Sequence, residues 1–504
     1  MDQTLARRVL AAGLALGLLS EFMLDGPAYG LNVVVIVAAT LGAGWLVRRR
    51  DRAPDPLDGW LPVTALLLAA FVALRGDPFM AFVDTSGAFA FSGASLVAFS
   101  GTPVTRRFAS VIAMMGTLAL GAALAGAVRV IGLARPSHVP GSAFLPRRVA
   151  PVVRGLFIGL PLAAIFAVLF ASADPIFRRA LADALGWRID FGDLGGRVVF
   201  TLACAWLGAG ALSVAAAGLP AVERSSLGAA ARSTVGIRSG LLGLTEALVV
   251  LVTIDLVIGA FVGLQIAYLF GGVDTLVAAG LTYSDYARRG FFELVAAACL
   301  AGAVVVALEA AVAGRNRVYV GGLLLLIGLT AVVLVSAALR LRLYQDAYGW
   351  TELRLYVLTT IVSLAAGLAL MAVLALRDRM RWLGHGLAVI GVVALVGLNL
   401  VAPAAFVAAR NVERVIDPSL VAPGGRAELD AAYLRILPDD AVPVLVGALP
   451  ALPESDRRTV LRLLRERKAE LAQDPSYRGL AAWNLGREGA RAALEGLEGL
   501  DTLH

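Results

Sequence analysis

The chain has 504 residues, of which 59% are hydrophobic and 16% are charged, and its mean hydropathy is +0.81. Soluble domains hold roughly 45–50% apolar and about 25% charged residues, so this composition excludes a soluble globular protein and predicts a polytopic membrane protein. The net charge of +7 comes from arginine that flanks apolar runs. We therefore expect the basic residues to meet the lipid bilayer and not nucleic acid.

Continuous apolar runs long enough to cross a bilayer recur along the chain as far as residue 409. Because barrel strands would alternate in hydrophobicity over about ten residues, these runs predict helices and an all-α transmembrane bundle. We count about twelve spans, within a range of ten to thirteen. They lie near residues 9–24, 31–47, 60–74, 79–100, 108–133, 155–172, 198–219, 241–270, 290–312, 318–339, 355–376 and 383–408.

The arginines of the early loops predict the orientation. They gather before the first run, after the second and after the fourth, while the loops between carry only Arg75. By the positive-inside rule the N terminus lies in the cytoplasm, and the protein resides in a bacterial inner membrane. With twelve spans, the C-terminal tail is cytoplasmic too.

Three regions follow from these patterns. Residues 1–150 carry about five spans, residues 151–409 carry about seven, and residues 410–504 form a soluble helical tail. Within the second region, residues 172–197 are partly apolar on one face and read as an interfacial segment after the break at Asp174-Pro175. A tail of this size buries only a modest core, so we expect it to dock against the membrane domain. Its predicted helices are Ala427–Leu437, Asp440–Leu449, Glu454–Ala472 and Asp474–Leu497.

The segment YSDYARRGFFEL is a dense polar cluster between two apolar runs. Charges at the bilayer centre cost several kcal/mol, about 2.5–3.5 for Arg or Asp, so the cluster lies at a membrane surface or faces a polar interior. It is either an interfacial anchor or a site for a lipid headgroup or anionic solute. Its candidate binding residues are Tyr283, Asp285, Tyr286, Arg288, Arg289 and Glu293.

A second polar cluster, RLRLYQDAYGWTELRLY, has the same character. In the predicted topology both clusters lie on the cytoplasmic side, so Arg289 could pair with Asp346 or Glu352 across them. A continuous helix here requires that it survive Gly349. The candidate binding residues of this cluster are Arg340, Arg342, Tyr344, Asp346, Glu352 and Arg354.

Polar residues inside the predicted spans are functional candidates by default, because burying them in lipid is costly. Glu246 and Asp255 are nine residues apart and face opposite sides of a straight helix, so they cannot form a dyad. Asp255 is the better buried proton or cation candidate, against a structural hydrogen bond. The intramembrane polar set is Glu246, Asp255, Gln265 and Glu309, together with Asp84, Arg129, His385 and Asn399.

No familiar catalytic or cofactor signature is present: the sequence lacks a P-loop, an HExxH motif, a CxxC pair and a GxSxG motif. Only three histidines occur, at scattered positions, so we expect no histidine-built metal centre and no cofactor. Carboxylate-only metal binding stays open. No catalytic residue can be assigned.

Several motifs together resemble the uncharacterised bacterial multi-pass membrane family called domain of unknown function 4173, which is related to family 4153. The resemblance spans roughly residue 150 to the C terminus, and it implies a polytopic membrane fold without an assigned activity. The motifs that carry it are ASADPIF at Ala171–Phe177, YLFGG at Tyr268–Gly272, the two polar clusters, YLRILPDDAVPVL at Tyr433–Leu445 and WNL at Trp483–Leu485.

Three functional hypotheses follow. The first is a transporter-like protein that handles lipids or small solutes, although no inverted repeat supports it. The second is a membrane sensor or scaffold whose helical tail engages a protein partner. The third is a membrane-embedded enzyme acting on a lipid-linked substrate.

Overall fold

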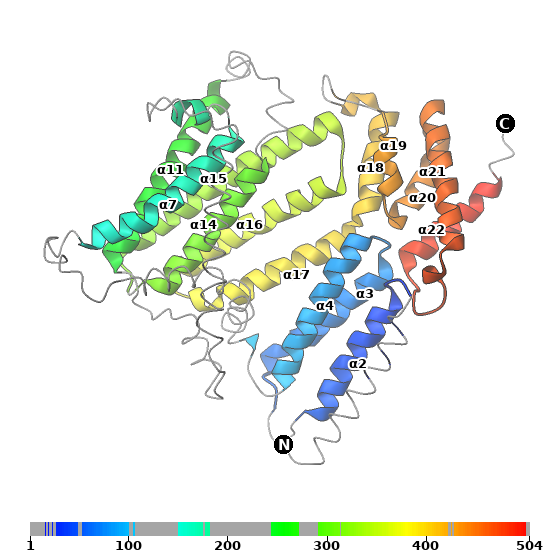
Figure 1. Ribbon diagram of the computed structural model, residues 1–504, viewed down its shortest axis with the longest axis horizontal. Helices are drawn as coiled ribbons and strands as arrows, with labels where there is room; N and C mark the ends of the chain where they lie inside the picture. Colours follow the sequence, from blue (N-terminus) through cyan, green and yellow to red (C-terminus); the bar gives the residue numbers. More distant parts are fainter. Residues whose placement is uncertain are drawn as a thin grey trace, which may run out of the picture. The chain divides into compact units, whose positions relative to one another are not determined.

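The computed structural model describes residues 27–48, 53–99, 104–105, 150–174, 177–181, 243–271, 291–312, 314–421, 425 and 428–499, with isolated positions at 16, 19 and 23. Within these ranges the elements are α-helices and short 3-10 helices (Figure 1). The predicted all-α class is therefore confirmed. The first and the fifth predicted spans, and the seventh near 198–219, lie largely or wholly outside the described residues.

Long apolar helices occupy the remaining predicted spans. Among the described residues, five are long and apolar enough to cross a membrane, namely Pro56–Leu74, Leu244–Gln265, Arg317–Tyr348, Glu352–Leu376 and Met380–Val401. The number of spans stays a prediction. The long helices are α2 (Leu31–Val47), α3 (Trp60–Leu74), α4 (Pro78–Phe99), α7 (Ala150–Ala173), α11 (Leu244–Gly271), α14 (Phe291–Ala311), α15 (Arg317–Tyr348), α16 (Glu352–Leu376) and α17 (Leu383–Val401).

The predicted last span, 383–408, is wrong as a single helix. The chain breaks at Ala402, whose φ of +53° lies in the left-handed region, and Pro403 begins a new helix. Proline is favoured at this first helical position because its missing N–H would have no intrahelical partner. The new helix, α18 (Pro403–Ile416), is amphipathic and belongs to the tail.

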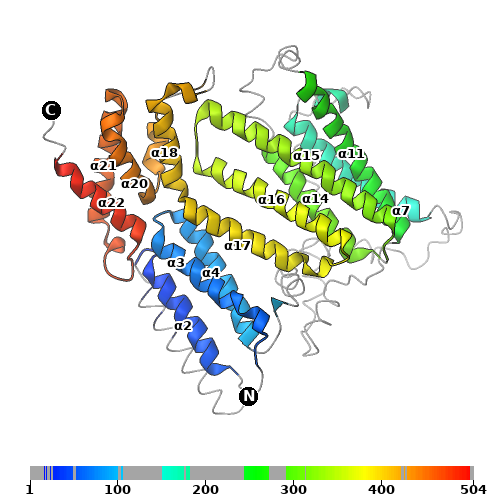
Figure 2. The same cartoon turned by 180° about the vertical axis from the view of Figure 1, so that it is seen from behind.

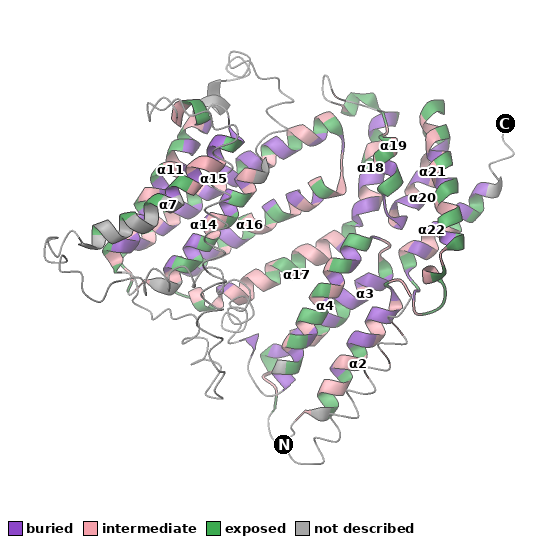
Figure 3. Ribbon diagram, in the orientation of Figure 1, coloured by how far each residue is buried: buried purple, intermediate pink, exposed green. Residues whose placement is uncertain are grey.

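The tail folds around a core of its own. Its helices are α18, α19 (Ala431–Ile436), α20 (Val442–Ala448), α21 (Glu454–Gln473) and α22 (Leu485–Glu495). The predicted helix Asp474–Leu497 is wrong over its first half, because a 3-10 turn and an extended segment precede α22. Figure 3 shows the buried faces of these helices turned toward one another. The buried core includes Val407, Val412, Leu434, Leu445, Leu449, Val460, Leu464 and Leu494.

The chain divides into two compact units that do not follow its order. The first unit contains residues 1–107, 345–359 and 388–504, and the second contains residues 108–344 and 360–387. The boundaries pass through α15, α16 and α17, so each of these helices contributes to both units. The tail belongs to the same unit as α2, α3 and α4.

In the first unit, α2, α3 and α4 pack into a small apolar bundle. Its core contains Val37, Leu41, Leu68, Phe71 and Val72, all buried. Apolar side chains also point outward from these helices, such as Val63 and Phe82, each 64% exposed. An apolar core together with an apolar outer surface is what lipid-facing helices require.

Aromatic stacking and a buried ion pair hold together the described helices α7, α11 and α15 of the second unit. The rings of Phe170 on α7 and Phe261 on α11 stack with centroids 4.0 Å apart. Arg340 donates to Asp174 Oδ2 at 2.8 Å and to the carbonyl of Ala173 at 2.9 Å, and both charged side chains are 2% exposed. Removing one partner of such a pair typically costs about 3–5 kcal/mol, because a buried charge is left uncompensated. This pair therefore fixes the end of α7 against α15.

Candidate functional site: the face where the tail caps helix ends

One asparagine joins the tail to a membrane helix. Asn484 is the N-cap of α22, and its side-chain oxygen accepts from the Arg487 N–H at 3.0 Å. Its amide nitrogen donates to the carbonyls of Val72 at 2.8 Å and Arg75 at 2.6 Å, at the C-terminal end of α3. The last carbonyls of a helix have no intrahelical donor. The buried Asn484 side chain therefore satisfies the ends of two helices at once.

The start of α2 is capped by backbone carbonyls of the tail. The Leu31 N–H donates to the Trp483 carbonyl at 3.0 Å, and the Asn32 N–H donates to the Ala481 carbonyl at 2.9 Å. A Cβ on Gly30 would lie 2.4 Å from the Trp483 oxygen, so only glycine allows this approach. Figures 1 and 2 both show α22 beside the end of α2 that begins at Leu31.

The turn between α15 and α16 is held by α18. Gly349, with φ of +79°, ends α15, so the second polar cluster is not one continuous helix. Asn411 accepts from the Trp350 N–H at 2.8 Å and donates to the Trp350 carbonyl at 2.9 Å. The guanidinium of Arg414 donates to the Asp346 carbonyl at 2.8 Å, at the end of α15. A cation there also complements the negative end of the helix dipole.

Carboxyl groups meet where α4 and α16 begin. Asp77 is 2% exposed, and its Oδ1 caps α4 by accepting from the Phe79 N–H at 2.8 Å. The Tyr356 hydroxyl donates to Asp77 Oδ2 at 3.0 Å. The Glu352 carboxyl lies near Asp77, and the Glu352 N–H donates to the Tyr433 hydroxyl at 2.8 Å.

Asp440 brings a third acid from the tail. Its Oδ2 accepts from the Gly76 N–H at 3.0 Å. Burial raises the pKa of Asp440 to about 6; the Gly76 N–H and the charge of Arg75 lower it, whereas the charge of Asp77 raises it. Burial likewise raises the pKa of the Tyr433 hydroxyl to about 12. The acids Asp77, Glu352 and Asp440 thus form a cluster whose charge depends on the docked tail.

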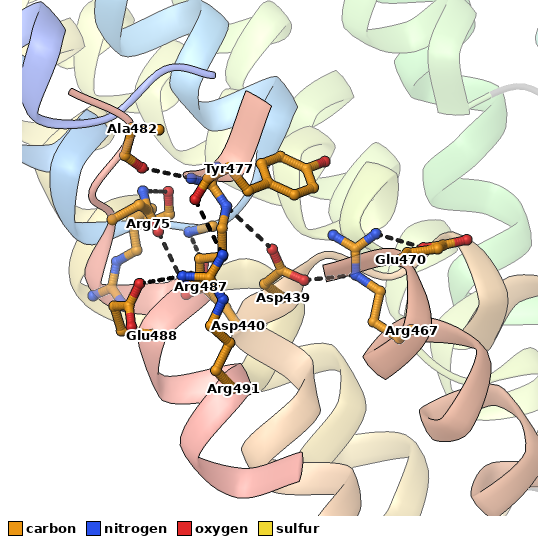
Figure 4. Close-up of polar contacts among 12 residues, drawn as sticks. Arg75, Asp439, Asp440, Arg467, Glu470, Tyr477, Ala482, Arg487, Glu488 and Arg491 are labelled. Carbon is orange, nitrogen blue, oxygen red and sulfur yellow. Dashed lines mark hydrogen bonds and ion pairs between the residues drawn. The ribbon is translucent and has the colours of Figure 1, made fainter. Parts of the chain in front are cut away.

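A polar network inside the tail supports this face (Figure 4). Asp439, 2% exposed, accepts from Arg467 at 2.8 Å. The guanidinium of Arg487 donates to the Ala482 carbonyl at 2.7 Å and lies over the Tyr477 ring, 4.3 Å from its centroid. These contacts fix α21 and α22 around the segment that caps α2 and α3.

Most of the first predicted cluster cannot be placed. Tyr283, Asp285, Tyr286, Arg288 and Arg289 lie outside the described residues, so the pairing of Arg289 with Asp346 or Glu352 stays a prediction. Glu293 lies in the first turn of α14 and is half-buried.

The second predicted cluster divides between the units. Arg340 belongs to the second unit and pairs with Asp174. Arg342 and Asp346 are exposed, and Tyr344 is half-buried. The guanidinium of Arg354 donates to the Gly349 carbonyl and so helps to close the turn. Only Glu352 of this set joins the acid cluster.

Two of the predicted intramembrane candidates have structural partners. Glu246 accepts from the Gly243 N–H at 2.9 Å and caps α11. Glu309 pairs with Arg315 at 2.9 Å, and Arg315 also donates to the Ala375 carbonyl at the end of α16. Asp255 and Gln265 are buried in α11, with side-chain atoms that meet no hydrogen-bond partner in the described part of the chain.

The contacts of the tail bear on the predicted sides of the membrane. The twelve-span topology placed the tail and the α15–α16 turn in the cytoplasm, and the loops before α2 and α4 on the other side. The tail bonds both loops, from Ser476 to the Ala28 N–H and from Asp440 to Gly76. For helices that cross the bilayer, these contacts place the tail beside the loops before α2 and α4. The number of spans and the side of the membrane on which the tail lies stay predictions.

The residues that build this face went unrecognised as functional in the sequence. Asp440 and Asn484 lie within the family motifs, but no role could be assigned to them. Two local signals were available: the Gly-Asp-Pro before α4 is typical of an N-cap followed by proline at the first helical position, and an asparagine precedes α22. Neither signal reveals that the caps bind other helices.

The fold and this face define an integral helical membrane protein whose tail is docked on helix ends. A family model described as Domain of unknown function (DUF4153) matches residues 14–448, and the chain belongs to that family. The related family 4173, which the motifs resemble, is not the one matched, and the match includes residues before 150, where no motif carries the resemblance. No curated protein and no solved structure matches the chain.

Docking should depend on Asn484 and on close packing at Gly486. A Cβ on Gly486 would lie 2.2 Å from Asp440 Oδ1 and 2.6 Å from the Gly76 nitrogen, whereas one on Gly489 of the same helix would meet nothing within 4 Å. Asn484→Ala loses a cap and two donors to helix-end carbonyls, which we expect to cost about 2–4 kcal/mol. In limited proteolysis, N484A and G486A should release the tail while G489A matches the parent protein. Equal protection of all three variants would contradict the docking.

Docking should also weaken as pH rises. Because the folded pKa of Asp440, about 6, lies above the unfolded value of about 3.9, its contribution to stability is full at low pH and is lost as pH rises through 6. Thermal unfolding in detergent should show a midpoint that falls between about pH 4 and 6. Asp440→Asn keeps an acceptor for Gly76 and should flatten this fall. An unchanged slope in D440N would assign the pH dependence to other groups.

Proposed function

We propose that this protein is a membrane sensor or scaffold in which the tail reports the state of the membrane helices. One observation carries the proposal: groups of the tail satisfy the backbone at the start of α2, the end of α3, the end of α15 and the start of α16. A shift of any of these helices would leave polar groups unsatisfied, at about 1–3 kcal/mol each. The position of the tail is therefore coupled to that of the helices.

The proposal places the tail outside the cytoplasm. The connection from α2 to α3 leads to the start of α3, whereas Asn484 contacts the other end of that helix. This connection carries four arginines, Arg48, Arg49, Arg50 and Arg52. Arg377, Arg379 and Arg381 likewise follow the end of α16 that is remote from Glu352. Fewer arginines flank the tail side, at positions 75, 340, 342 and 354. By the positive-inside rule, the arginine-rich ends are cytoplasmic, and so is the N terminus.

The tail offers a surface to a partner. Arg458, Arg462 and Arg465 are exposed on α21 at the i, i+4 and i+7 positions of one face. Side chains at this spacing form a continuous stripe, which favours an acidic protein surface.

A second candidate function is the proton-linked handling of a small solute. Asp77, the cap of α4, and Asp84, within it, are seven residues apart and so lie on the same side of that helix. This face leads from the acid cluster at the tail into the apolar bundle, as a proton path through a membrane protein would require.

Complementation would separate these functions. In cells that lack the protein and show a growth or envelope defect, the sensor proposal expects N484A to abolish rescue, because the tail no longer follows the helices. Asp255→Asn should rescue fully, and G489A serves as the neutral control. The opposite pattern, with N484A active and Asp255→Asn inactive, would favour solute handling.

The sidedness is tested by fusions. Alkaline phosphatase joined after His504 should be active and green fluorescent protein joined there should be dark, because the first folds only outside the cytoplasm and the second only inside. The reciprocal result is expected for fusions in the α2–α3 connection. A fluorescent C-terminal fusion with an inactive phosphatase fusion would overturn the assignment.

A further inference from the structure

A buried acid and a buried amide face each other inside the first unit. Asp84 lies on α4 and Asn399 on α17, and both are 0% exposed. The Asn399 amide nitrogen donates to Asp84 Oδ1 at 3.0 Å and to the Leu395 carbonyl at 3.0 Å. Both hydrogens of the amide are therefore used.

Two oxygens of this pair are left without a donor. Asp84 Oδ2 and Asn399 Oδ1 are buried and meet no hydrogen-bond partner in the described part of the chain. An ionised Asp84 would thus combine an uncompensated charge with an orphan amide oxygen in an apolar bundle, which is strongly unfavourable. A single proton removes both penalties, because it turns Oδ2 into a donor.

We propose that Asp84 and Asn399 form a proton-binding site in the membrane region. In the resting state Asp84 is the neutral acid, and its Oδ2–H donates to Asn399 Oδ1. This hydrogen bond runs beside the one that the Asn399 amide nitrogen donates to Asp84 Oδ1, and in the opposite direction. The proton comes from water and returns to water, and no covalent bond between heavy atoms changes. Its release would leave two acceptors facing each other and push α4 and α17 apart. The site does not depend on the proposed role of the tail.

Few charged groups surround this site. Asp77, seven residues before Asp84 at the cap of α4, carries a like charge, and Arg75, after α3, carries an opposite one. The helix α2 has no ionisable side chain, and His385 of α17 lies about four turns from Asn399.

Infrared difference spectroscopy tests the protonation state directly. The full-length protein in lipid nanodiscs should show a protonated carboxylic acid band at neutral pH that is absent from Asp84→Asn. The exposed helix-cap variant Asp430→Asn should keep the band. A spectrum in which D84N removes only a carboxylate band would overturn the proposal.

Thermal unfolding separates a proton from a metal cation. An asparagine at position 84 can reproduce both hydrogen bonds, so D84N should melt like the parent protein at about pH 6. Toward about pH 9 the parent protein loses the proton of Asp84 and its midpoint should fall, whereas the midpoint of D84N should not. Asp84→Leu should melt lower at every pH. If sodium ions raise the midpoint of the parent protein and not of D84N, the site binds a cation, and the proton proposal fails.

Discussion

The first unit depends on a single constraint: helix ends leave backbone donors and acceptors without partners, and they must be satisfied where water is scarce. Here the tail supplies the partners. Asn484 bonds the last carbonyls of α3, backbone carbonyls at Ala481 and Trp483 receive the first N–H groups of α2, and Arg414 reaches the end of α15. The tail is therefore part of the membrane unit and not a module tethered to it.

The acid cluster is a consequence of that capping. Asp77 is placed by its role as the cap of α4, and Asp440 by its bond to Gly76. Each contact is favourable alone, yet together they bring carboxyls near Glu352, which burial makes costly to ionise. The docked state therefore binds protons more readily than the undocked one. This links the state of the tail to pH without any dedicated histidine.

Two other charged pairs among the described residues are neutralised locally. Arg340 is paired with Asp174, and Arg315 with Glu309, so these residues hold helices together and leave little charge free for a ligand. Asp84 differs, because it meets an amide in place of a cation. That difference separates a structural ion pair from a site whose protonation can change, and it is why the second candidate function rests on α4 and not on the predicted clusters.

The sequence by itself determined the helical class, the membrane setting and the bounds of most helices, because apolar runs and caps are local signals. The sequence also contains the proline that starts α18 and the glycine that ends α15, both of which are local signals of a helix boundary. Only the tertiary structure decided that Asn484 reaches the end of α3, that Asp440 lies near Asp77, and that the loops before α2 and α4 bond the tail. These contacts join residues hundreds of positions apart, and their partners are backbone groups, which every residue carries and no side-chain pattern distinguishes.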